Sequence, residues 1–266
     1  MYHSAVAGRG RLRLLHLSAA FFAVIACMAV LASSAFADVT EVSGGAFGES
    51  VDVTTLLNAH VTSGPLPSVT LPATGGGPFT NSVLSANVPG LLTAGVLNVS
   101  TEGGNLGSHQ GFAKSSASVA NVNALAGLIT AQVIASECNS NGDGSTGSST
   151  LTTVRVLGTL VAVNPAPNTV INLPAVGSVT LNEQVRPSDG PGDTSIIVRA
   201  IHIRLNGTLG NGDVIIAESR CGAKGPDVVP VAPIGLLGIT AVLGAGFAGT
   251  QWKKRRHNQA VAASTH

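Results

Sequence analysis

Apolar and polar residues alternate with a period of two through the middle of this chain, and a β-strand sorts such residues onto two faces. For example, Val179 and Leu181 alternate with Thr180 and Asn182. Runs of this kind, or runs rich in Val, Ile and Thr, occupy 47–53, 154–163, 195–205 and 214–219. Clusters of Gly, Pro, Asn and Asp separate them at 75–78, 139–149, 189–193 and 210–213. Short strands with such turns predict an all-β fold, an antiparallel β-sandwich over 38–227.

The segment from Ser115 to Cys138 leaves two element types open, because its Ala, Asn and Ser content also fits a helix. Residues 119–123 include two Val and two Asn, which are poor helix formers, and Gly127 interrupts the run. We therefore expect strands here.

Two Pro-rich stretches resemble each other and suggest an internal duplication. The stretch from Pro65 to Gly75 matches that from Pro165 to Gly177, with two residues inserted, and each is followed by a strand that ends in Cys. This pattern predicts two related halves, roughly 46–138 and 150–221. Chance similarity between stretches rich in Val, Thr, Pro and Gly is the alternative.

The first 37 residues have the pattern of a secretory signal peptide. A basic stretch from Arg9 to Arg13 precedes an apolar run over 17–31, and Ala35 and Ala37 mark a cleavage site. The alternative is a lipoprotein signal in which Cys27 carries the lipid. The residues after Cys27 stay apolar, which favours cleavage after Ala37.

The other end of the chain has the pattern of a membrane anchor. Residues 228–250 carry no charge and are followed by Trp252 and a basic cluster at 253–256. About 20 residues of helix cross the roughly 30 Å hydrocarbon layer, so the run predicts a transmembrane helix. The positive-inside rule makes 251–266 a cytoplasmic tail and 38–227 extracellular, anchored to the cell membrane. A buried core helix is the alternative.

Residues 71–75 read LPATG, the pentapeptide that sortases cut. A sorting signal directly precedes its apolar anchor, whereas more than 150 residues separate this one from residue 228. We therefore interpret it as a turn that follows a short strand.

Charge and aromatic content exclude two classes of binding protein. Residues 38–227 contain 13 acidic and seven basic residues, a net charge of −6, so a nucleic-acid partner is not expected. The same range has no Trp or Tyr, and Phe only at 47, 79 and 112. Sugar-binding faces and single-strand platforms rest on exposed aromatic rings, so neither is expected.

The sequence predicts no catalytic residue and no cofactor. The middle offers three histidines, His60, His109 and His202, and no nucleophile motif accompanies them. His202 lies within an apolar strand, where it is expected to face the polar side.

Acidic side chains give the remaining candidate sites. Glu49 with Asp52, and Asp189 with Asp193, could flank a substrate, although an acidic surface is the simpler interpretation. The best metal candidate is calcium, bound by oxygen ligands at alternate positions. These are Asn139, Asn141 and Asp143, with Gly144 as the sixth residue of the loop. The twelfth position is Thr150 where a bidentate Glu is needed, so a hairpin loop without metal is favoured.

Cys138 and Cys221 are the two cysteines left after signal removal. In an oxidising compartment, two cysteines at matching strand ends predict a disulfide. No further ligands lie at metal-binding spacing.

Several stretches combine into a pattern that resembles a known family. They are VPGLLTAGVLNVS at 88–100, SASVANV at 116–122, VNPAPNT at 163–169, LNEQ at 181–184, AIHI at 200–203 and SRCG at 219–222. Over nearly all of 45–225 the chain resembles the choice-of-anchor P family of bacterial surface proteins. The resemblance implies a secreted domain of actinobacterial type, joined to one of several C-terminal anchors, with matching cysteines at Cys138 and Cys221. It implies no catalytic residues.

Together these observations predict a secreted, membrane-anchored surface domain without catalytic activity, serving envelope structure or adhesion. Its partners would be the membrane, through the C-terminal helix, and an envelope or host-surface ligand. The alternative is an extracellular ligand- or calcium-binding protein or a hydrolase, using the acidic loops near Asp143 and Asp189.

Overall fold

The computed structural model describes residues 38–187 and 192–225. These residues form antiparallel sheets and no α-helix, which confirms the all-β prediction. The predicted signal peptide with Cys27, the anchor at 228–250, the tail at 251–266 and Asp189 lie outside the described residues. Within the described ranges, no helix has the length and hydropathy needed to cross a bilayer.

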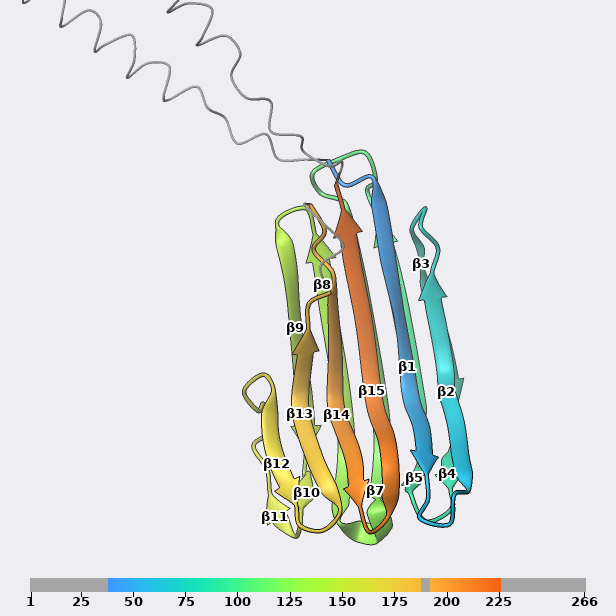
Figure 1. Ribbon diagram of the computed structural model, residues 1–266. Coiled ribbons are helices and arrows are strands. Elements are labelled where there is room, and N and C mark those ends of the chain that lie inside the picture. The colour runs from blue at the N-terminus through green and yellow to red at the C-terminus, as the bar shows by residue number, and fades with distance from the viewer. Residues whose placement is uncertain (1–37, 188–191, 226–266) are drawn as a thin grey trace, which may run out of the picture. The chain divides into compact units, whose positions relative to one another are not determined.

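One sheet has six strands in the order β12-β13-β14-β15-β1-β2, shown at the front of Figure 1. The bounds are Glu41–Thr54 (β1), His60–Leu71 (β2), Thr169–Leu173 (β12), Gly177–Val185 (β13), Ile196–Gly207 (β14) and Gly210–Lys224 (β15). All neighbours run antiparallel. Its two longest strands, β1 and β15, are neighbours in the sheet and are the first and last described strands of the chain.

The second sheet has nine strands, with β3-β6-β7-β8-β9 as its long central series. Short pairs extend it, with β5 and β4 beside β7, and β10 and β11 beside β8. The bounds are Gly76–Val83 (β3), Ala86–Val88 (β4), Leu92–Ala94 (β5), Leu97–Gly104 (β6), Phe112–Ala124 (β7), Ile129–Asn141 (β8), Gly144–Thr152 (β9), Arg155–Val156 (β10) and Thr159–Leu160 (β11). A 3-10 turn, Leu125–Gly127, joins β7 to β8.

Branched aliphatic side chains from both sheets form one core between the layers. In the nine-stranded sheet, Leu97, Val119 and Ile134 lie in one cross-strand row and are fully buried. In the six-stranded sheet, Ile201 and Ile216 form a cross-strand pair in the same cluster. Each such side chain stabilises the fold by roughly 1.5–3 kcal/mol. This core holds the two layers together in the absence of large aromatic rings.

A second, smaller core surrounds a disulfide between the sheets. Cys138 of β8 and Cys221 of β15 are bonded, with their Cα atoms 5.9 Å apart, which confirms the predicted bridge. The sheets lie close together here and small residues fill the gap. A Cβ atom added to Gly147 would come within 2.3 Å of the buried Val198 side chain.

Most predicted strands are confirmed. The alternating and Val-, Ile- or Thr-rich runs at 47–53, 179–185, 195–205 and 214–219 lie in β1, β13, β14 and β15. The segment 115–138 forms the greater part of β7 and β8, so strands are confirmed over a helix. The LPATG stretch ends β2 at the buried Leu71 and then turns, with the N–H of Gly75 donating to the carbonyl of Pro72 at 2.8 Å.

Two expectations are wrong. The run 154–163 is not one strand, because Leu157 and Gly158 take positive φ and divide it into β10 and β11. Most of the turn predicted at 139–149 belongs to β8 and β9, and the turn itself is a two-residue hairpin at 142–143. The duplication into halves 46–138 and 150–221 stays a prediction; their two cysteines lie in different sheets, Cys138 in the nine-stranded sheet and Cys221 in the six-stranded sheet.

Candidate functional site

A row of charged side chains crosses three neighbouring strands of the six-stranded sheet. Register pairs Glu183 of β13 with Arg199 of β14, and Arg199 with Glu218 of β15. His202 lies further along β14, between the core residues Ile201 and Ile203. Since successive strand residues face opposite sides, His202 points away from the core. The charged group therefore lies on the outer face of this sheet.

Arg199 joins the two carboxylates of the row. Its Nη1 donates to Glu183 Oε2 at 2.8 Å, and its Nε donates to Glu218 Oε2 at 2.7 Å. Arg220 also donates to Glu218, and its guanidinium lies 5.7 Å from the ring centroid of Phe47. Glu218 has no exposed surface, so these two arginines take the place of water around its carboxyl group.

His202 connects the row to a further carboxylate, that of Asp213 on β15. Its Nδ1 lies 2.8 Å from Glu183 Oε2, and its Nε2 lies 2.8 Å from Asp213 Oδ1. Each ring nitrogen of His202 thus contacts a carboxylate oxygen. His202 faces the polar side, as its strand position predicts, and it is buried there within the ionic group.

The ionic group shifts two of its own pKa values. Desolvation raises the pKa of Glu183, but hydrogen bonds from Arg199 and His202 and their positive charges bring it below its ordinary value. Desolvation lowers the pKa of Arg199, but the hydrogen bonds and charges of Glu218 and Glu183 raise it above its ordinary value. These partners hold one another in their charged forms. Both nitrogens of His202 are engaged by carboxylates, an arrangement suited to joining strands and unsuited to a general base.

The two carboxylates of the first predicted pair have different surroundings. Glu49 is fully buried and accepts a hydrogen bond from Ser63 Oγ at 2.8 Å, and desolvation raises its pKa. Asp52 is exposed and lies 2.7 Å from His60 Nε2. They do not face a common space as a catalytic pair requires. In the second pair, Asp193 accepts hydrogen bonds from the backbone N–H and the hydroxyl of its near neighbour Ser195.

The three calcium candidates gather at the hairpin between β8 and β9, around one shallow hollow. Asn141 Oδ1 accepts hydrogen bonds from the N–H groups of Asp143 and Gly144, at 3.0 and 3.1 Å. Asp143 Oδ1 lies 3.0 Å from His109 Nε2, and Asn139 is exposed on β8. Two of the three predicted ligand oxygens thus have protein partners that Ca²⁺ would displace. Within the described ranges, no three His, Cys, Asp or Glu side chains gather as a metal site.

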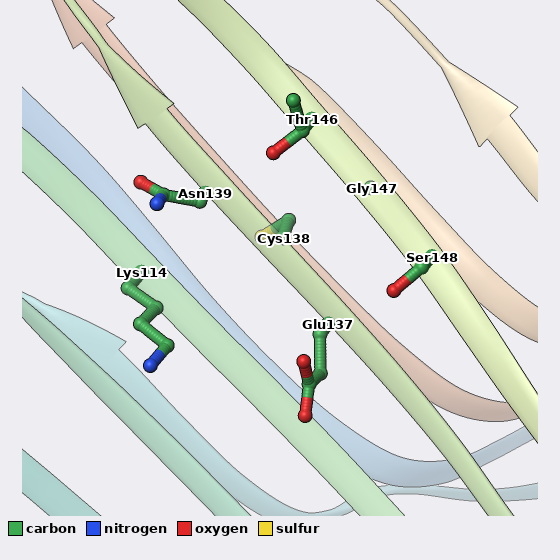
Figure 2. Close-up of a pocket in the computed structure, with 7 residues that line it drawn as sticks. All are labelled: Lys114, Glu137, Cys138, Asn139, Thr146, Gly147 and Ser148. Atoms are coloured by element: carbon green, nitrogen blue, oxygen red, sulfur yellow. The ribbon is translucent and has the colours of Figure 1, made fainter.

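A neighbouring hollow lies on the outer face of β7, β8 and β9, and Figure 2 shows its side chains. Lys114 and Glu137 come from adjacent strands, and Asn139, Thr146 and Ser148 complete the polar lining. Glu137 and Asn139 flank Cys138, whose sulfur bonds toward the other sheet, so they face outward. This hollow offers hydrogen-bonding groups and one charge of each sign.

The charged row was not identified from the sequence, which singled out His202 alone. The available signal was the placement of Arg199, His202 and Arg204 within an otherwise apolar strand. Such residues need partners when buried, but the sequence does not say which carboxylates supply them. The chain matches no protein-family model, and neither curated proteins nor solved structures contain one that is significantly similar to it.

Proposed function

We propose that residues 38–227 form a secreted β-sandwich domain that is displayed on the cell surface and serves envelope structure or adhesion without catalysis. In this proposal the signal peptide over 1–37 exports the chain and the apolar segment 228–250 anchors it. The resemblance to the choice-of-anchor P family agrees with that arrangement. The outer partner is an envelope or host-surface ligand.

The observation that carries the proposal is the disulfide between Cys138 and Cys221. It joins the two sheets across 83 residues of sequence. Protein disulfides form and persist in oxidising compartments and are rare in the cytosol. A structural bridge of this kind therefore supports export of the domain.

The chemistry of the charged groups supports a non-catalytic role. The most prominent group, built on Arg199, consists of mutually paired charges. Its histidine has a carboxylate at each ring nitrogen. A hydrolase would instead present a base next to a nucleophile in a cleft. The hollows near Glu137 and Asp143 are shallow and polar, and they suit contact with a surface ligand better than enclosure of a small substrate.

Protease treatment of intact cells tests the display. We expect added protease to remove residues 38–227 from intact cells, while a cytoplasmic marker protein stays whole. Mass spectrometry of the mature protein should find Asp38 at the amino terminus and no free thiol at Cys138 or Cys221. Digestion of the domain only after lysis would refute the proposal.

A further inference from the structure

One end of the two sheets presents leucine side chains to solvent from its loops. This is the lower end of Figure 1, where β1 turns into β2, β14 into β15, and β10 into β11. The exposed fractions are 91% for Leu57, 67% for Leu56, 59% for Leu160, 45% for Leu157 and 37% for Leu209. Other apolar side chains are exposed as well, among them Leu84 at 83% and Val170 at 60%, but Leu56, Leu57 and Leu209 come from two adjacent loops, and neighbouring exposed apolar groups can mark an interaction surface.

The loop between β1 and β2 holds its two leucines rigidly. The N–H of Thr55 donates to the carbonyl of Ala59 at 2.8 Å, and the N–H of Asn58 donates to the carbonyl of Thr55 at 2.9 Å. The Thr55 hydroxyl also accepts from the N–H of Ala59 at 3.2 Å. Leu56 and Leu57 occupy the apex of this closed turn. These hydrogen bonds order the loop before binding, which lowers the entropy cost when a partner buries the leucines.

The turn between β14 and β15 lies beside this loop. Thr54 pairs with Asn211, and a Cβ atom added to Gly210 would lie 2.3 Å from the Thr54 carbonyl oxygen. Leu56 lines a hollow together with residues from both tips. Leu209 follows on the same turn. Residues 55–59 and 206–211 contain no charged side chain, so the two adjacent loops form a neutral projection that carries three leucines, which we name the leucine tip.

The described chain begins and ends at the opposite end of the sheets from the leucine tip (Figure 1). The last strand, β15, runs from the tip to that end over 15 residues. At about 3.3 Å per residue it separates the two ends by roughly 50 Å. The leucine tip therefore lies far from both ends of the described chain.

Size and charge decide between the kinds of partner. A stable protein interface takes about 20–30 residues a side, with aromatic residues and Arg enriched at its centre. The leucine tip has five and six residues in its two loops, none of them aromatic or Arg. A bilayer, in contrast, accepts a few projecting leucines without shape complementarity. We propose that the leucine tip inserts into the interfacial region of a lipid bilayer, and that it does so without anionic lipids, since it carries no Lys or Arg.

This inference is independent of the proposed anchor, and its test avoids the apolar segment 228–250. Both core clusters, all strands and the disulfide lie within 38–225, so a fragment of those residues keeps every described contact. The fragment has no Trp, because the single Trp of the chain is Trp252. Leu57→Trp therefore creates a unique fluorescent reporter at the tip. Val185→Trp, at a half-exposed site at the end of β13, is the matched control.

We expect vesicles of phosphatidylcholine to shift the emission of the Leu57→Trp fragment to shorter wavelength, and to leave Val185→Trp unchanged. Adding Leu56→Asn to Leu57→Trp should weaken binding roughly tenfold or more. Vesicles that also contain phosphatidylglycerol should bind within about twofold of the neutral ones. No shift with either vesicle overturns the inference. A shift at both reporter sites, binding only to anionic vesicles, or a shift with protein concentration alone would overturn it as well.

Discussion

Replacing both disulfide cysteines by alanine tests whether the bridge between the sheets supplies a large part of the stability. The bond joins Cys138 and Cys221 across 83 residues of sequence. Opening a loop of that size releases entropy in the unfolded chain worth about 4.5 kcal/mol at 25 °C on the loop-closure model. For a domain of this length each kcal/mol corresponds to about 2–4 °C, so we expect Tm to fall by roughly 9–18 °C.

Urea unfolding of the oxidised protein and of the Cys138→Ala/Cys221→Ala variant measures this loss. The m-value should rise in the variant, because an unfolded chain without the cross-link exposes more surface. The single variant Cys221→Ala is the control for lost packing, since it breaks the same bond while keeping one buried side chain. If the cross-link carries the effect, the single and double variants should agree within about 1 kcal/mol. A double variant within about 1 kcal/mol of the oxidised protein would refute the reasoning.

Three further predictions concern the charged row and the close approach of the sheets. Arg199→Met should lower the unfolding free energy by roughly 1.5–3 kcal/mol because it removes one charged hydrogen-bond donor from each of Glu183 and Glu218. The exposed Arg204→Met should cost under about 1 kcal/mol, and equal losses in urea unfolding would contradict this. Burial raises the pKa of Glu49, so the protein should lose stability as pH rises through that pKa, and Glu49→Gln should remove this loss. The pKa of Glu183 is lowered, so its contribution to stability should disappear as pH falls through that pKa, and Glu183→Gln should remove this dependence. Melting temperatures of the Glu49→Gln and Glu183→Gln variants, measured against pH, check the two opposite signs. Gly147→Ala should cost roughly 1–3 kcal/mol through overpacking, and calorimetry finding no loss would contradict the packing described.

The strands were predictable from local patterns and the sheet order was not. The alternation around Val179 and the apolar run around Ile201 identify β13 and β14, because strand residues on one face share one environment. Which strands lie side by side depends on long-range pairing, such as β1 with β15, the first and last described strands. Short strands were missed for another reason. β10 and β11 have two residues each, too few to show a period.

The charged row escaped prediction because the alternation of β13 and of β15 is interrupted at matching positions. Counting by twos from Val214 and Ile216, both in the core, would place Glu218 in the core as well. Ala217 takes a φ of 58°, and Asn182 on β13 takes a φ of 50° at the matching position. Each interruption moves the following residue to the other face. A sequence pattern read without these backbone angles assigns the wrong face to the carboxylates that Arg199 joins.

The open sides of the two-sheet stack are covered by side chains, which bears on the adhesive role proposed for the domain. Gln184 Nε2 donates to the carbonyl of Gly147 on β9 at 2.9 Å, and Arg186 donates to the carbonyl of Ser145 on the same strand. On the other side, Asn81 of β3 donates across to a carbonyl of β2, a strand that also carries two prolines.

An uncovered edge strand can pair with a strand of another molecule, and both capped carbonyls and prolines prevent such pairing. At these edges, strand addition from a partner would first have to displace those side-chain hydrogen bonds. Side-chain contacts through the polar faces or the leucine tip do not carry that cost. Adhesion by this domain should therefore depend on side chains at those surfaces, and substitutions there should alter it without changing the fold.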